Sequence, residues 1–227
     1  MRQASISPYL AEHAAIEGHA QLALVSLFVT PYEAPALIIS ECQRGILDAD
    51  RSVSSGLAEQ AAARRIVPRI GALADAFRER GLPVIHCIIE HRPDQAGMLP
   101  NSYLGVMALR GRSMQAGTTD VDIPAELGPR PLDFVSSRAT GLTAFYGTDL
   151  DATLRLNGVR TLILVGVSTN LALPGLAVEA VNRGYDVVLA EDCTAGSSVE
   201  AHEFQVANQL KLLARISSAE EIATRLP

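Results

Sequence analysis

Residues 161–170 read Thr-Leu-Ile-Leu-Val-Gly-Val-Ser-Thr-Asn, and this stretch decides the fold class. Thr161 to Val165 is apolar at nearly every position, so both faces of the strand that it predicts are buried. A strand at the surface of an antiparallel sheet alternates apolar and polar residues instead. The stretch therefore predicts a central strand of a parallel sheet, whose carboxyl end leads through Gly166 to Asn170 directly into a helix.

Similar apolar runs lie on both sides of this strand, separated by segments with helical periodicity. They predict five further strands, at 36–39, 84–89, 133–136, 186–190 and 213–216. Strands that alternate with helices are typical of right-handed βαβ units. We therefore predict one doubly wound α/β domain over residues 35–227, with three α/β/α layers around a mainly parallel six-stranded sheet.

Local signals predict where two of the helices begin and end. Pro68 suits the start of the helix between the first two strands, and Gly81 suits its end. Ser197 with Glu200 forms a capping box for a helix that runs to about Ala214.

Residues 1–34 stand apart from the alternating pattern. Residues 9–19 predict a helix, and residues 22–29 a strand or an arm. We interpret this segment as an N-terminal extension that packs on the domain or on a neighbouring subunit.

Composition excludes several classes of partner. The 227 residues carry 19 Lys+Arg against 25 Asp+Glu, a net charge of −6, which is unsuited to gripping nucleic acid or an anionic membrane. The apolar stretch 20–29 reaches about half of the roughly 20 residues that span a bilayer, and no cationic segment precedes it. Three cysteines without a CxxC pair favour a reduced, cytoplasmic compartment and give no zinc signature.

Polar residues follow the predicted strands. They are residues 40–43 after the first strand, residues 90–94 after the second, Arg138 after the third, and the helix start at 166–170 after the fourth. Ligands of such sheets bind outside the carboxyl ends of the strands. Two acids, an arginine and helix-terminal amides would converge there, which predicts acid–base chemistry on a bound anion.

Three stretches carry a family resemblance: PALIISECQ at 35–43, TAFYGTDLDATLRLNGVRTLILVGVSTN at 143–170 and VEAVNRGYDVVLAEDCTAG at 178–196. Residues 35–195 resemble the isochorismatase-like hydrolases, also called the cysteine hydrolase superfamily. The resemblance implies the fold predicted above, a small-molecule substrate, a homodimer or homotetramer, and a cis peptide bond between Val167 and Ser168.

The chain departs from the family pattern at all three catalytic positions. The family uses an Asp at the end of the first strand, a Lys before the Phe-containing loop and a nucleophilic Cys near the start of the following helix. Glu41, Arg138 and Ala172 occupy these positions here, although Arg138 lies about one residue farther from the loop than the pattern has it.

These departures favour one branch of the family chemistry. Ala172 offers no nucleophile, whereas members resembling the isochorismatase branch protonate an enol ether with the strand-one acid and need no cysteine. Glu41 would then be the general acid–base and Arg138 the clamp for an anionic group. Two alternatives stay open: an amidohydrolase with a relocated nucleophile, and a non-catalytic binding or interaction protein.

The remaining candidates are expected to line the substrate pocket, with the amides near Leu171 and Ala172 as an anion cradle; they are Gln43, Glu90, His91, Phe145, Tyr146, Thr169, Asn170, Leu171 and Ala172. Adjacent ligands on a strand end diverge, so Glu90 and His91 predict no metal site. No GxGxxG or P-loop is present, and no organic cofactor is expected. His86 is expected in the core, and His202 on the surface.

Overall fold

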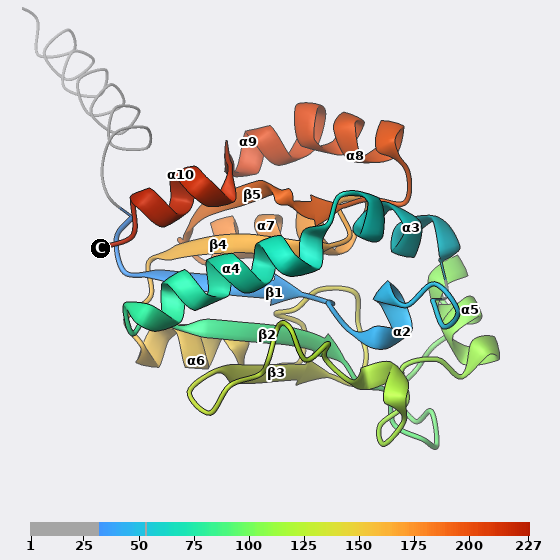
Figure 1. The fold of residues 1–227 in the computed structure, drawn as a ribbon. Coiled ribbons are helices and arrows are strands. Elements are labelled where there is room, and N and C mark those ends of the chain that lie inside the picture. Colours follow the sequence, from blue (N-terminus) through green and yellow to red (C-terminus); the bar gives the residue numbers. More distant parts are fainter. Residues whose placement is uncertain (1–31, 53) are drawn as a thin grey trace, which may run out of the picture. The chain divides into compact units, whose positions relative to one another are not determined.

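Six short strands form the sheet in the computed structural model, which describes residues 32–52 and 54–227. Every pairing is parallel, and the strand order is β3-β2-β1-β4-β5-β6 (Figure 1). The strands are β1 (Pro35–Ser40), β2 (Val84–Ile89), β3 (Phe134–Arg138), β4 (Thr161–Val167), β5 (Asp186–Ala195) and β6 (Arg215–Ser217). The predicted six-stranded α/β fold is confirmed, and the sheet is parallel throughout.

Every strand except β2 ends beyond the residue that the sequence predicts; β1 ends at Ser40, β4 at Val167 and β6 at Ser217. β3 extends to Arg138, because it pairs with β2 up to Ile89↔Arg138. β5 extends to Ala195, because its pairing with β4 resumes after an irregularity and joins Thr194 to Gly166 and Ala195 to Val167. Both extensions lie at the carboxyl edge of the sheet, where the polar residues gather.

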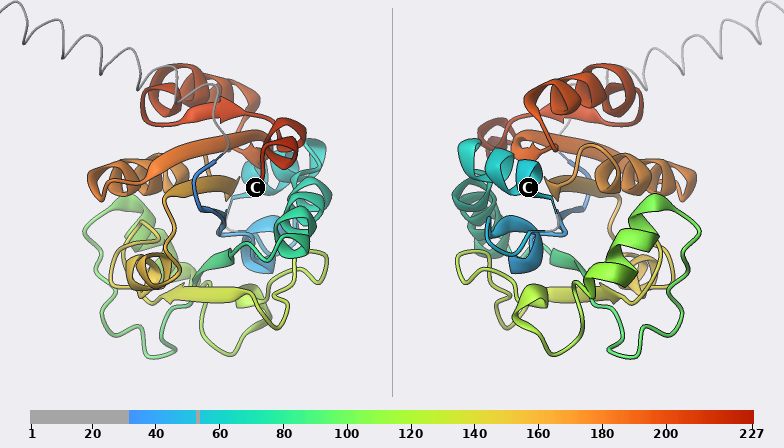
Figure 2. Two further views of the ribbon diagram at one scale, coloured as in Figure 1. Left: turned by 90° about the vertical axis from the view of Figure 1, so that its left-hand side faces the viewer. Right: turned by 90° about the vertical axis from the view of Figure 1, so that its right-hand side faces the viewer.

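Helices cover both faces of the sheet (Figure 2). On one face, α4 (Ile66–Glu79) and α10 (Ala219–Thr224) pack with α3 (Ser55–Ala63) over an apolar core that includes Leu37, Ile39 and Phe77. On the other face, a second core includes Leu164 and Leu176. The helices of that face are α6 (Leu150–Leu156), α7 (Ala172–Asn182), α8 (Val199–Gln205), the π-helical turn η2 (Val206–Leu210) and α9 (Lys211–Leu213).

The predicted helix boundaries are partly correct. Gly81, with φ of 66°, follows the end of α4 as expected. Pro68 is the third residue of α4, which begins at Ile66. The predicted cap of α8 is wrong by one residue, because the Ser198 hydroxyl, 3.1 Å from the Ala201 amide, accepts the capping bond.

One excursion at the carboxyl edge has no counterpart in the sequence predictions. It lies between His91 and Gln115, which form an isolated bridge at its base. It contains α5 (Tyr103–Gly111), a helix that buries none of its residues and leaves Tyr103 82% exposed. The other unpredicted elements are α2 (Arg44–Leu47), α3 and the 3-10 turn η1 (Thr119–Val121).

Residues Tyr32–Pro227 form one compact unit. The helix expected at 9–19 and the strand or arm expected at 22–29 lie outside the described residues. Within residues 32–52 and 54–227, no helix is long and apolar enough to cross a membrane.

Candidate active site

The strand order changes direction between β1 and β4. The chain runs from β1 outward to β2 and β3, and then returns to the other side of β1 with β4. Such a switch point is where open α/β sheets bind ligands. The ends of both strands lie close together there, since a Cβ on Gly166 would stand 2.2 Å from the Ser40 carbonyl oxygen.

Glu41 and Arg138 form an ion pair at this edge of the sheet. Nη2 of Arg138, the last residue of β3, donates to Oε1 of Glu41, the first residue after β1. Since β2 lies between β1 and β3, the pair reaches across the end of β2. The side chains are only 5% and 13% exposed, respectively. Glu41 has a φ of 52°, a conformation that a non-glycine residue adopts at an energetic cost and that is enriched at functional sites.

Hydrogen bonding of this pair is incomplete. Among residues 32–52 and 54–227, Arg138 makes one other side-chain bond, a long one of 3.4 Å from Nε to the Gly141 carbonyl oxygen. Within the described part of the chain, Nη1 of Arg138 and Oε2 of Glu41 have no partner. A guanidinium has five N–H donors and a carboxylate about four acceptor sites, so both groups keep capacity for a ligand.

The start of α7 lies next to this pair in the topology, after the end of β4. Ala172 is its first residue and is 5% exposed. The Leu173 amide donates to the Ser168 carbonyl at 3.0 Å, whereas no described residue accepts from the Ala172 amide. An unpaired amide at a helix start suits an anion. The Val167–Ser168 peptide bond is cis, as the resemblance implies.

Glu90 and His91 follow β2 and lie beside the end of β3. Oε2 of Glu90 accepts from the Ser137 hydroxyl at 3.1 Å, and its amide donates to the Arg138 carbonyl at 2.9 Å. The ring Nδ1 of His91 is 2.9 Å from the Ala139 carbonyl, which can only accept, so Nδ1 carries the proton. Both residues are therefore close to Arg138 in the fold.

The side chains of Phe145 and Tyr146 lie in different environments. Phe145 is buried, stacked on Tyr185 at 6.2 Å between centroids, with the Arg183 guanidinium 4.4 Å above its ring. Tyr146 is 59% exposed, and its ring lies over Gly141, where a Cβ would stand 2.3 Å from it. Since Gly141 also accepts from Arg138, Tyr146 is the aromatic residue near the ion pair.

Gln43 is fully buried and joins the segment after β1 to the end of β2 and to η1. Its Nε2 donates to the Ile89 and Val121 carbonyls at 2.8 and 3.1 Å, and its Oε1 accepts from the Ile89 amide at 2.7 Å. Its amide group is thus engaged with backbone rather than directed to the Glu41–Arg138 pair.

The end of β4 is held by a histidine that the sequence interpretation misplaced. His202 is buried, at 2% exposure, and its Nδ1 lies 3.2 Å from the Thr169 hydroxyl oxygen. The expectation of a surface histidine is wrong, because His202, Val206 and Leu210 recur every four residues along the apolar side of one helical segment. That spacing is the signal in the sequence that could have found it. The next residue, Asn170, contacts the loop between β5 and α8: its Oδ1 accepts a hydrogen bond from the Ser197 amide at 2.7 Å.

All three cysteines are buried and unpaired. Burial raises the pKa of the Cys87 and Cys193 thiols to about 12, and it raises the pKa of Cys42 further. A nucleophilic cysteine needs a thiolate, which a raised pKa disfavours near neutral pH.

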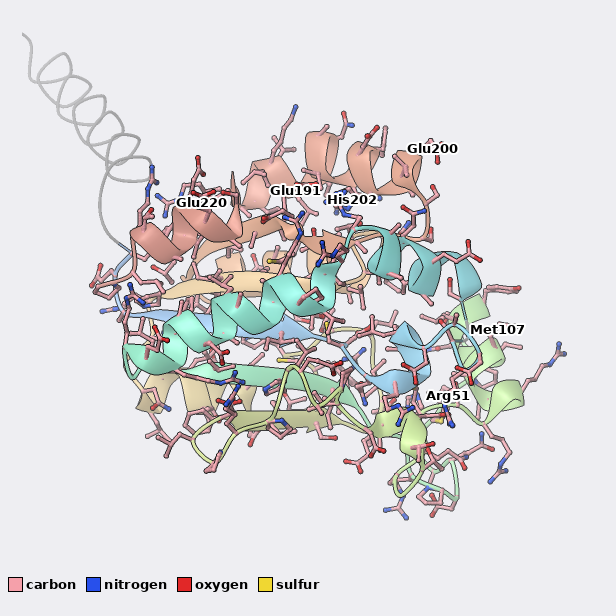
Figure 3. All side chains as sticks on the ribbon, viewed as in Figure 1. Arg51, Met107, Glu191, Glu200, His202 and Glu220 are labelled. Carbon is pink, nitrogen blue, oxygen red and sulfur yellow. The ribbon has the colours of Figure 1, made fainter. Side chains whose placement is uncertain are left out.

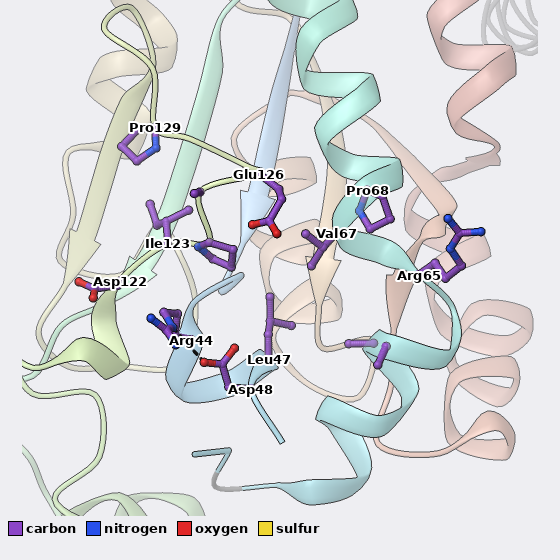
Figure 4. A pocket seen from close by; sticks show the side chains of 14 residues that line it. Arg44, Leu47, Asp48, Arg65, Val67, Pro68, Asp122, Ile123, Glu126 and Pro129 are labelled. Atoms are coloured by element: carbon purple, nitrogen blue, oxygen red, sulfur yellow. Dashed lines mark hydrogen bonds and ion pairs between the residues drawn. The ribbon is translucent and has the colours of Figure 1, made fainter. Parts of the chain in front are cut away.

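A large cavity lies apart from these residues, beside α2 and the start of α4 (Figure 4). Its volume is about 930 Å³, and both apolar side chains, such as Val67 and Ile123, and charged ones, including Arg44, Asp48 and Glu126, line it. None of the residues that line it belongs to the predicted site. No group of three or more His, Cys, Asp and Glu side chains within 32–52 and 54–227 is arranged to hold a metal ion.

Comparisons with known proteins place these features in a family. The model of the isochorismatase domain matches residues 35–221. The uncharacterized isochorismatase family protein YecD of Escherichia coli O157:H7 is 30% identical over 204 residues, which cover 84% of this chain and 95% of that protein. Ureidoacrylate amidohydrolase RutB of Agrobacterium fabrum is 35% identical over 86 residues, covering 38% and 37% of the two chains.

Among solved structures, an isochorismatase family protein from Desulfovibrio vulgaris superposes with a TM-score of 0.73 at 25% identity, over 84% of this chain and 97% of that one. The fold and the matched domain thus agree. The chain belongs to the isochorismatase family of hydrolases.

Proposed function

We propose that the chain hydrolyses a small anionic metabolite by acid–base catalysis, with Glu41 as the acid–base and no covalent cysteine intermediate. The observation that carries the proposal is the buried Glu41–Arg138 pair at the switch point, with hydrogen-bonding capacity left on both groups. Family membership supports hydrolysis, and the alanine at position 172 supports a route without a covalent thioester.

The proposed roles follow from the chemistry of each group. Arg138 binds a substrate carboxylate through the N–H groups that Glu41 leaves unused, in the paired geometry that a lysine cannot offer. The amides at the start of α7 bind a second negative oxygen. In its protonated form, Glu41 gives a proton to the vinyl carbon of an enol ether, and water adds to the resulting oxocarbenium ion. The Glu41 carboxylate takes back the proton that water loses, and the hemiketal then breaks its C–O bond to release the alcohol and a carbonyl product.

A second candidate is the amidohydrolase, favoured by the segment similar to ureidoacrylate amidohydrolase. It needs a nucleophile other than Ala172. The buried thiols with raised pKa values supply none near neutral pH, which is why we place this candidate second.

We further propose a cytoplasmic homodimer or homotetramer whose residues 1–34 pack as an extension. Three free cysteines suit a reducing compartment, and the family resemblance supports the assembly.

The test is turnover of two sets of probes: enolpyruvyl ethers, followed by release of pyruvate, and primary amides and N-carbamoyl compounds, followed by release of ammonia. Glu41→Gln should lower kcat about 10²- to 10⁴-fold, the usual contribution of a general acid–base. Glu126→Gln is the matched control, because it makes the same change in the lining of the 930 Å³ cavity. It should turn over the probes as the wild type does.

Each other outcome overturns the proposal in a recognisable way. Loss of activity on treatment with iodoacetamide, together with ammonia release, would establish the amidohydrolase. Loss of activity in Glu126→Gln but not in Glu41→Gln would move the site to the cavity. Ligand-induced thermal stabilisation without turnover of any probe would identify a binding protein.

A further inference from the structure

Four side chains form a continuous hydrogen-bonded network behind the start of α7. His202 lies at its centre, with Nδ1 3.2 Å from Oγ1 of Thr169 and Nε2 2.7 Å from Oε1 of Glu191. Figure 3 shows Glu191 and His202 side by side where β5 meets α8. Arg64, from the C-terminal end of α3, completes the network through Nη2, 2.5 Å from the same Glu191 oxygen.

The partners determine which way each hydrogen bond of His202 points. The ionised carboxylate of Glu191 only accepts, so Nε2 of His202 must carry a proton. The carboxylate is ionised over a wide pH range, because the bond from His202 and the charge of Arg64 lower its pKa to about 2. In neutral His202, Nδ1 then has no proton, and the Thr169 hydroxyl donates to it. Glu191 therefore fixes the tautomer of the imidazole and, through it, the orientation of the Thr169 hydroxyl.

Thr169 connects the His202 side chain to the backbone turn that leads into Ala172, the first residue of α7. It is fully buried, its amide donates to the Ala195 carbonyl at 3.0 Å, and it lies three residues before Ala172. Full burial rules out contact of its hydroxyl with substrate, so it is not a nucleophile.

The loop after β5 packs tightly on the same turn. A Cβ on Gly196 would stand 2.6 Å from Oγ1 of Thr169 and 2.9 Å from Oδ1 of Asn170. Only a glycine lets this loop approach so closely, and the approach brings the Ser197 amide within 2.7 Å of Asn170. The turn before α7 is thus held from behind at three separate points, by β5, by α8 and by the loop between them.

We propose that His202 and Glu191 are positioning residues: through Thr169 they hold the amides at the start of α7 in the orientation that binds the substrate's anionic group. The site needs such a device because no side chain at position 172 contributes to binding, so anion affinity there depends on backbone geometry alone. The part concerning substrate affinity rests on the proposed function, whereas the part concerning backbone order does not.

The test removes the hydroxyl without changing the volume. In Thr169→Val, hydrogen exchange of the amides of residue 169 and of Leu173 should accelerate about tenfold or more, because the turn loses its anchor. Thr169→Ser should restore wild-type exchange. Thr161→Val is the matched control, since Thr161 is also buried, at 2% exposure, but lies at the opposite end of β4. It should leave both amides unchanged.

Kinetics on the probe that the wild type cleaves supply the second readout. Thr169→Val should raise KM about tenfold with kcat within about twofold, because ground-state binding of the anion is lost. A purely structural role would lower the folded fraction, and hence the apparent kcat, at an unchanged KM.

Glu191→Gln, on a partly exposed residue, serves if Thr169→Val does not fold; it should move exchange and KM in the same direction by about threefold. Unchanged exchange in a folded Thr169→Val overturns the inference, even if Glu41→Gln abolishes turnover. Accelerated exchange in Thr169→Val supports the backbone part, even if no probe is cleaved and the proposed function fails.

Discussion

Strand β3 has a buried arginine–carboxylate cluster at each end, and the two clusters differ in how fully they are hydrogen-bonded. Asp133, just before the strand, pairs with Arg78. Arg138, at its last residue, pairs with Glu41. The sequence pattern alone does not tell a structural pair from a functional one, but the count of occupied donors and acceptors does.

Asp133 is saturated. Its carboxylate accepts from Arg78 Nη2 at 2.7 Å, from Arg78 Nε at 3.2 Å and from the Arg130 amide at 2.9 Å, and it lies 3.2 Å from Nε2 of His86. Arg78 also donates to Asp75 and to the Leu127 carbonyl. The carboxylate of Asp133 thus joins α4, β2 and β3 and has no acceptor site left for a ligand, although Nδ1 of His86 beside it is buried without a partner.

The Glu41–Arg138 pair, at the other end of β3, is less fully hydrogen-bonded than Asp133. Glu41 and Arg138 share one short contact, and each keeps unused hydrogen-bonding groups. Nη1 of Arg138 and Oε2 of Glu41 are not among the fully buried atoms that lack a partner, so this pair keeps accessible groups for a ligand at the switch point. Three predictions separate the two ends of β3.

The largest effect is expected at the saturated end. Asp133→Ala leaves the largely buried Arg78 without its main partner and should lower the free energy of unfolding by about 3–5 kcal/mol, measured by denaturant titration. Asp75→Ala is the control, because Asp75 bonds the same Arg78 from a half-exposed position and should cost below about 1 kcal/mol. Equal losses in the two variants would contradict the distinction.

An intermediate effect is expected at the ligand-binding end. Arg138→Lys keeps the charge but loses the paired geometry, so kcat/KM on a cleaved probe should fall about tenfold, or about 1.4 kcal/mol. Arg78→Lys should do the reverse, with a lower free energy of unfolding and unchanged kcat/KM, because Arg78 donates to Asp75, Asp133 and Leu127. A fall in kcat/KM for both variants would show that the assay reports only folding.

The smallest effect concerns pH. Burial lowers the pKa of His86 from 6.5, and the nearby Arg78 acts in the same direction, against the bond to Asp133. The unfolded chain therefore takes up the proton at a higher pH than the folded chain, so stability is lost as pH falls below about 6.5. His86→Gln should flatten the dependence of the unfolding free energy on pH between about 7 and 5. An unchanged slope would mean that other groups dominate it.

The sequence predicts the fold well because the central strands are apolar on both faces. β2 lies at the predicted residues, and β4 lies there with an extension to Val167. The edges are less predictable, since Ser137 and Arg138 continue β3 with polar residues whose pairing depends on β2. α5 is not predictable in the same way, because it has no buried stripe to leave a pattern.

The candidate site is predictable only as far as the ends of the strands. Glu41 and Arg138 lie at the carboxyl ends of two strands of one parallel sheet, which predicts that they converge, and their side chains form an ion pair across the end of β2. The network around His202 depends on residues 33 positions apart and on the close approach at Gly196, which no local pattern specifies. Phe145 and Tyr146 are neighbours in the sequence, but only tertiary packing decides which of them is buried.

The excursion that holds α5 joins the sheet through a narrow base. The His91 amide donates to Met114 at 2.7 Å and the Ala116 amide to His91 at 2.8 Å, closing a loop whose helix contributes nothing to either apolar core. Local unfolding of α5 exposes no residue of either core, because none of its residues is buried. Its free energy of local unfolding is therefore independent of that of the sheet. The excursion thus lies at the carboxyl edge outside both cores, attached at its base and through the Thr140 hydroxyl, which donates to the Gly97 carbonyl at 3.1 Å, so changes in α5 leave the packing of β1–β6 untouched.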